Sequence, residues 1–126
     1  MAMTNYLSNA LANAVVRNTS YTSPATVYAA LYSTAPTVST SGTELSGSNY
    51  SRQAVTFSAP SAGVATSNVA VTFGAASANW TAAVAIGITD ASTSGNILYF
   101  KTIATQVVLS GASLVIDSGD ITVTMA

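Results

Sequence analysis

The side chains that could do chemistry are few in this chain. A typical soluble domain is about 25% charged, whereas 6% of these 126 residues are charged, and the chain has neither histidine nor cysteine. Those two residue types supply many of the general bases, nucleophiles and metal ligands of proteins. We therefore expect no enzyme, no catalytic residue, no bound metal and no cofactor. The charged residues are Arg17, Glu44, Arg52, Asp90, Lys101, Asp117 and Asp120.

The acidic residues could in principle form either of two sites, a Ca²⁺ site or the carboxylate pair of a glycosidase. Asp117 and Asp120 flank a Ser-Gly turn, which could form a weak Ca²⁺ site from carboxylates and carbonyls. The other interpretation is a turn in which aspartate caps its own backbone, and it is favoured because no third carboxylate is near in sequence. A glycosidase needs two converging carboxylates, but all four acidic residues fall in predicted loops or turns, so this interpretation is disfavoured.

Arg52 lies inside a predicted strand, in the segment YSRQAVTF at residues 50–57. A charge in the middle of a strand needs an explanation in a chain with so few charges. Arg52 could pair with Glu44 or with an acidic group of a neighbouring subunit. It could equally be a solvent-facing edge charge that discourages aggregation.

Tyrosines gather in the first half of the chain, at positions 21, 28, 32 and 50. They could form a platform on which sugar rings stack. Tyrosine is also common in cores and protein interfaces, and a sugar site would need more polar partners than Asn49 and Arg52. The packing interpretation is therefore favoured.

The pattern of the chain predicts one domain, residues 1–126, of the mainly β class. Residues 4–17 have apolar side chains at helical spacing and Thr4 as the N-cap, so residues 1–17 are predicted to be a helical arm. From residue 18 onward, short β-forming segments alternate with turns about every ten residues. Residues 18–126 are therefore predicted to form an antiparallel, jelly-roll-like β-sandwich. The predicted strands are residues 26–33, 50–57, 64–73, 80–88, 97–104, 106–109 and 121–125, with 114–116 between the last two and a long polar loop at 34–49.

Charge also bears on the partners. The net charge is −1, and no cluster of Lys and Arg is present to attract nucleic acid or an anionic membrane. The first residues lack the basic and apolar regions of a signal peptide. A net charge near zero favours association between proteins. We expect no nucleic-acid or membrane partner.

Several segments stand in a distinctive order: NYLSNAL at 5–11, YTSPATVYAALYS at 21–33, GTELSG at 42–47, and AVTF at 70–73 before Trp80. With GNILY at 95–99 and YSRQAVTF at 50–57, they make the chain resemble a family of small tailed-bacteriophage virion proteins. The resemblance covers residues 5–125, and YSRQAVTF is its most specific part. It implies a virion component without catalytic residues, described in such families as capsid cement, minor tail or tail-fibre protein.

The functional hypothesis is a capsid decoration or cement protein, made in the host cytoplasm and placed on the capsid surface. Its partners would be the major capsid protein and itself, as a dimer or trimer. The alternative is a minor tail or tail-fibre-associated protein that contacts host glycans through its tyrosine-bearing strands. For the decoration protein, the helix and the loop 34–49 are predicted to make the contacts between subunits. The predicted interface residues are Tyr6, Leu7, Leu11, Val15, Pro36, Glu44, Leu45, Tyr50 and Arg52.

Overall fold

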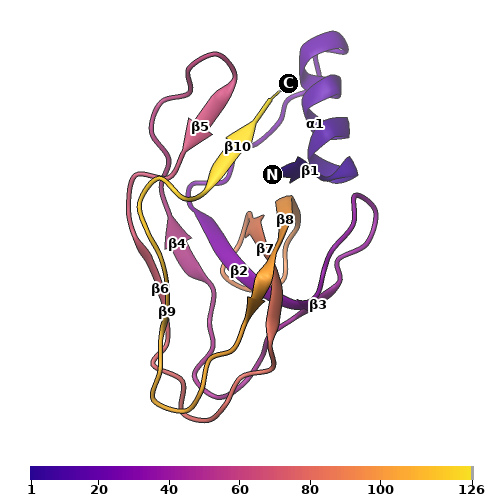
Figure 1. Cartoon of the computed structure of the whole chain (residues 1–126). Helices are drawn as coiled ribbons and strands as arrows, with labels where there is room; N and C mark the ends of the chain where they lie inside the picture. The colour runs from indigo at the N-terminus through magenta and orange to yellow at the C-terminus, as the bar shows by residue number, and fades with distance from the viewer. Residues whose placement is uncertain (126) are drawn as a thin grey trace.

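The computed structural model describes residues 1–125 and shows a mainly β fold in which the strand pairs are antiparallel (Figure 1). One sheet has six strands, with β8 and β2 on either side of β7. Two small sheets of two strands each lie beside it. The elements are β1 (Ala2–Met3), α1 (Asn5–Val16), β2 (Val27–Thr34), β3 (Thr43–Glu44), β4 (Gln53–Val55), β5 (Val64–Thr66), β6 (Val71–Phe73), β7 (Ala83–Thr89), β8 (Ile97–Gln106), β9 (Leu114–Ile116) and β10 (Thr122–Thr124).

The large sheet is built on its three longest strands. β2 pairs with β7 from Tyr28 opposite Thr89 to Tyr32 opposite Ala85, and β7 pairs in turn with β8. These strands are rich in Val, Ile, Leu and Tyr, which pack well on a pleated surface. Most of β2 and β7 is buried on both faces. The sheet is extended by β1 beside β8, and by β3 and β4 beside β2.

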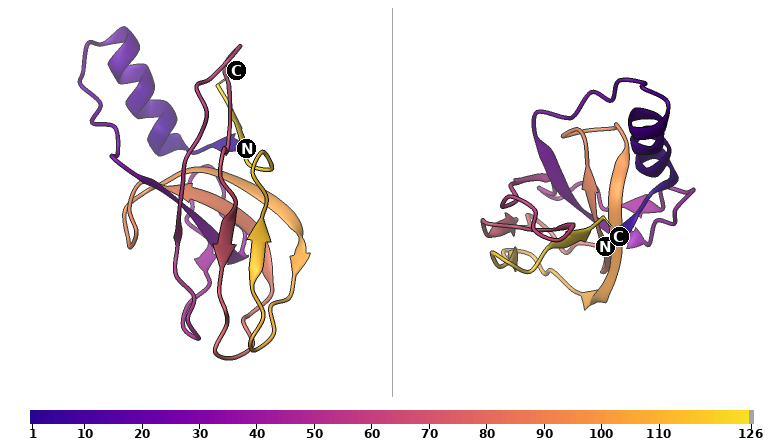
Figure 2. Two further views of the ribbon diagram at one scale, coloured as in Figure 1. Left: turned by 90° about the vertical axis from the view of Figure 1, so that its left-hand side faces the viewer. Right: turned by 90° about the horizontal axis from the view of Figure 1, so that it is seen from above.

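The small sheets are made of three-residue strands. β5 pairs with β10, and β6 pairs with β9. Figure 2 shows these strands running along one flank of the molecule, facing the concave side of the large sheet. Between the two layers lies the main apolar core. Its most deeply buried members are Leu31, Val55, Val71, Phe73 and Ile88.

The helix begins and ends where the sequence predicts. The side-chain oxygen of Thr4 accepts a hydrogen bond from the Leu7 amide at 3.4 Å, as an N-cap does, and its hydroxyl donates to the carbonyl of Ile97 at 2.6 Å. The first turn is therefore fastened to β8. Leu7 is the one fully buried residue of α1. Beyond it the helix leans away from the strands (Figure 2, left).

Several strand boundaries differ from the prediction. The segment 64–73 is two strands, β5 and β6, because buried Ser67 interrupts it and bonds the amides of Gly119 and Ile121. Residues 50–57 pair as a strand only over β4. The predicted strand 106–109 is absent among the described residues, since β8 already extends to Gln106. β1 and β3 were not predicted; β3 lies within the polar loop 34–49. The sandwich is antiparallel as predicted, and its jelly-roll character remains a prediction.

Candidate functional site: an enclosed arginine network and an exposed helix end

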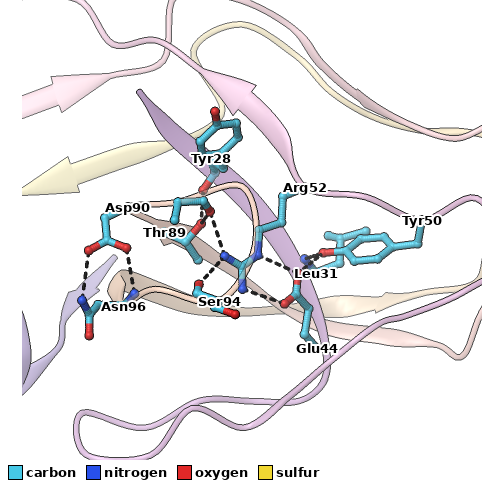
Figure 3. Close-up of polar contacts among 10 residues, drawn as sticks. Tyr28, Leu31, Glu44, Tyr50, Arg52, Thr89, Asp90, Ser94 and Asn96 are labelled. Carbon is cyan, nitrogen blue, oxygen red and sulfur yellow. Dashed lines mark hydrogen bonds and ion pairs between the residues drawn. The ribbon is translucent and has the colours of Figure 1, made fainter. Parts of the chain in front are cut away.

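Arg52 is the centre of the most extensive polar network in the described chain (Figure 3). Its Nε donates to Oε2 of Glu44 at 2.9 Å and its Nη2 to Oε1 at 2.8 Å, a bidentate ion pair. Its Nη1 donates to the carbonyls of Ala91 at 2.8 Å and Ser94 at 2.7 Å. The side chains of Arg52 and Glu44 are 10% and 25% exposed. Such fork-to-fork geometry is the strong form of ion pair, and the bonds to Glu44 raise the pKa of Arg52 above its ordinary value.

Tyr50 connects this ion pair to the core. Its hydroxyl donates to Glu44 Oε2 at 2.8 Å and accepts the Leu31 amide of β2 at 2.9 Å. Its ring stacks on Phe73, with centroids 6.1 Å apart, and meets Trp80 edge to face at 5.6 Å. Burial raises the pKa of Tyr50, so the phenol stays protonated and keeps donating to the carboxylate.

The loop of residues 90–96 is fixed from both sides. Asp90 accepts from the backbone amide of Asn96 at 2.7 Å and from its side-chain amide at 3.0 Å. Gly95 has φ +70°, and a Cβ at this position would collide with Oδ1 of Asp90. Because Arg52 donates to two carbonyls of this loop, the tip between β7 and β8 is held to the segment just before β4 and, through Glu44, to β3.

A hollow of about 250 Å³ lies beside the ion pair and is bordered by Tyr32, Gly42, Glu44, Arg52 and Ser94. Tyr32 is 2% exposed, and its hydroxyl has no hydrogen-bond partner among the described residues. Its ring lies so close to Gly87 that a Cβ there would be 2.8 Å away. Burial raises the pKa of Tyr32 to about 12.

The polar groups of this network are bonded mainly to one another and to the backbone. A guanidinium, a carboxylate and a phenol that bond one another have few free donors or acceptors left for a substrate. The network joins β2, β3, the residues just before β4 and the 90–96 loop. Of the three interpretations of Arg52, the pairing with Glu44 is confirmed.

The remaining acidic residues lie apart from the network. The backbone carbonyl of Asp117 accepts the backbone amide of Asp120 at 3.1 Å, which closes the turn, and capping by the aspartate side chains stays a prediction. In residues 1–125 no group of three acidic, histidine or cysteine side chains is placed to hold a metal ion. Tyr32 and Tyr50 are packed inside the fold and offer no stacking platform.

The predicted interface residues fall into two groups. Leu7, Pro36 and Leu45 are buried within the chain, Leu11 is partly buried, and Glu44, Tyr50 and Arg52 belong to the network described above. Only Tyr6 and Val15 are well exposed. That these residues contact a partner stays a prediction. Because the others are covered by their own chain, Tyr6 and Val15 are the better candidates for such a contact.

Sequence reasoning missed other exposed apolar side chains. Val16, next to the predicted Val15 at the end of α1, is 76% exposed, close to the 81% of Val15 itself. Val107, Leu109 and Val115 are also exposed. The alternation of small and apolar residues predicts strands but does not show which positions lack a covering layer. A run of two valines closing a short helix was the available signal.

The fold and its enclosed network define a small antiparallel β protein whose central polar cluster is bonded within the chain. A family model described as "Podophage GP4 fiber I protein gp80" matches residues 2–124. The match spans nearly the whole chain, so the protein belongs to this family, a phage virion structural family of the tail-fibre type. No curated protein matches the chain.

In the part of the chain that the structure describes, no helix is both long and apolar enough to span a bilayer.

Proposed function

We propose that this chain is a structural subunit of the phage tail, in or beside a fibre, and that it acts by packing against neighbouring proteins and not by catalysis. The match of residues 2–124 to a fibre family carries the proposal. That observation favours the tail over the capsid surface, the location first expected from the sequence.

The geometry supports a packing role. The most elaborate polar cluster is used to hold loops, with Arg52 and Glu44 bonded to each other and to backbone carbonyls. The ends of the molecule carry exposed apolar side chains, among them Val15 and Val16. A rigid body with apolar residues at its surface is suited to repeated contacts with neighbours.

The test is the location and number of copies in purified virions. Quantitative mass spectrometry against the major capsid protein is expected to give far fewer copies of this chain than of the capsid protein. Antibody labelling in electron micrographs is expected at the tail. A copy number equal to that of the capsid protein, with label over the head, would instead support a decoration protein. Absence from particles would overturn both assignments.

A catalytic role can be tested on the same material. Purified protein incubated with host surface polysaccharide is expected to release no reducing ends. Release that disappears in the Glu44→Gln variant, with folding preserved by circular dichroism, would contradict the non-catalytic proposal.

A further inference from the structure

A groove of about 390 Å³ lies between the second half of β8 and the strands β9 and β10. Small-molecule sites in proteins are hollows of about 300–1,000 Å³ with mostly apolar walls and a few polar groups. The groove has this size and character, so the charged groups that border it decide which ligand fits. Most of its lining residues are apolar, among them Ile86, Ile103, Leu114, Ile116 and Ile121.

The only lysine of the chain, Lys101, lines this groove. In the pairing of β7 with β8, Lys101 lies opposite Ile86, and Tyr99 lies two residues before it on β8. Because side chains alternate along a strand, Lys101 is on the same face of the sheet as Ile86 and Tyr99, which both belong to the apolar core. Lys101 is exposed and forms no ion pair within residues 1–125. An otherwise apolar strand face therefore carries an unpaired cation at the groove.

Two further charged groups border the groove. The ammonium group of Met1 donates to the carbonyl of Thr122 at 3.1 Å, and both residues line the groove. Asp120 supplies one carboxylate and, like Lys101, forms no ion pair in the described part of the chain. Two cations and one anion leave the groove with a net charge of +1. Such a site favours a singly charged anion.

We propose that the groove binds a fatty acid of medium chain length as its free carboxylate. The carboxylate lies between the ammonium groups of Lys101 and Met1, and the hydrocarbon chain lies along Ile103 and Ile116. The inference assigns a ligand site, which goes beyond the proposed structural role in the tail. That role is tested separately, by the location of the chain in virions.

Charge and volume select this class of ligand. A neutral hydrocarbon would leave the ammonium groups of Lys101 and Met1 without an anion, and a cationic amphiphile would be repelled by them. A single carboxylate matches the net charge of the groove. A phospholipid with two acyl chains needs more room, since the groove is near the lower end of the volumes found for such sites.

The first test measures the binding of decanoate to the full chain by isothermal titration calorimetry. Decanol and decyltrimethylammonium are the neutral and cationic probes with the same hydrocarbon chain. Decanoate is expected to bind at least about tenfold more tightly than decanol, because hydrogen bonds to charged groups are the stronger ones. The cationic probe is expected to bind most weakly. From hexanoate to octanoate to decanoate, the affinity is expected to rise about fourfold for each CH₂ that the apolar walls cover.

Three substitutions assign the binding to the groove. Lys101→Met is expected to weaken decanoate binding about tenfold and to leave decanol binding unchanged. Arg17→Met changes the net charge by the same amount at the end of α1, away from the lining residues, so this matched control is expected to bind decanoate like the wild type. Asp120→Asn removes a like charge and is expected to tighten decanoate binding about two- to fivefold. Circular dichroism checks the folding of each variant.

The position of the ligand is measured by NMR, from the shifts of backbone amides on addition of decanoate. The largest shifts are expected at residues 101–103 and 114–116. Four results would each overturn the site: no binding of decanoate, equal affinities for decanoate and decanol, shifts confined to other parts of the chain, or a Lys101→Met variant that binds like the wild type. Binding to vesicles of anionic phospholipid without binding of free decanoate would also overturn it, because the charges would then serve a membrane surface.

Discussion

The two arginines of this chain, Arg52 and Arg17, lie in opposite environments. Arg52 uses three nitrogens on Glu44 and two loop carbonyls, and its side chain is mostly covered. Arg17 lies exposed at the end of α1 beside two exposed valines. One region satisfies its polar groups within the chain, whereas the other leaves apolar and charged groups together at the surface. The difference separates the part of the molecule that maintains the fold from the part that is available to neighbours.

The largest effect is expected from removing Arg52. Arg52→Met leaves the Glu44 carboxylate partly buried without its partner and frees two loop carbonyls. We expect the free energy of unfolding to fall by about 2–4 kcal/mol, measured by urea denaturation. The matched change Arg17→Met is expected to shift it by less than about 0.5 kcal/mol. Equal effects of the two substitutions would remove the distinction between the regions.

A smaller loss of stability is expected from changes to the tyrosines in and beside the Arg52 network. Tyr50→Phe deletes a hydroxyl that serves both Leu31 and Glu44, and we expect a loss of about 1–2 kcal/mol. Tyr32→Phe deletes a buried hydroxyl that has no partner in the described chain, so stability is expected to be unchanged or slightly higher. The melting temperatures of the two variants and the wild type, measured by thermal denaturation, test both expectations. A large loss in Tyr32→Phe would show that its hydroxyl is bonded after all.

The same tyrosines predict an alkaline limit to stability. Tyrosine has a pKa near 10 when unfolded, and burial raises the pKa of Tyr32 in the fold to about 12. The folded state then holds its proton more tightly, so this stabilising contribution is complete below pH 10 and is lost as the pH rises from 10 toward 12. Urea midpoints between pH 8 and 11 are expected to fall at the alkaline end, and to fall less in Tyr32→Phe. A midpoint that is constant, or a fall of the same size in the variant, would contradict this.

The smallest effect is expected at the helix end. Val15→Ser combined with Val16→Ser removes exposed apolar side chains, so the stability of the monomer is expected to change by less than about 0.5 kcal/mol in dilute urea titrations. Leu7→Ala, at the buried end of the same helix, is the contrasting control and is expected to cost about 2 kcal/mol or more. A clear loss in the valine variant would mean that the helix end packs on its own chain.

Local signals predicted the local structure well. Thr4 before a stripe of apolar residues predicted the helix and its cap, and alternation predicted that Ile86 and Ile88 of β7 face the core, as they do. At the start of β7 the register shifts, and Ala83 faces that core where Val84 was expected. The pairing of Arg52 with Glu44 was one of three open alternatives. The sequence could suggest this pairing because the chain has so few charged residues from which a partner for Arg52 could come.

Features that depend on contacts between distant segments could not be predicted from the sequence. β3 lies in a polar stretch without periodicity, and it is a strand because β2 pairs with Thr43 and Glu44 and because Leu45 is buried. The break at Ser67 arises from its bonds to residues more than fifty positions away. Val16 is likewise exposed because no other element covers the end of α1 among the described residues, and the spacing of apolar residues does not predict this.

The pairing of β2 with β7 also has a consequence for the order in which the molecule can form. Tyr28 and Thr89 are bonded across 61 positions of the chain, so β2 cannot find its central neighbour until that whole length has been synthesised. Contacts between distant segments slow folding. Until β7 is made, the edge of β2 that pairs with β7 stays open, although β3 and β4, which pair with β2, come earlier in the chain. Newly made chains are therefore expected to depend on chaperones, or on slow synthesis, most strongly while residues 27–89 are emerging from the ribosome.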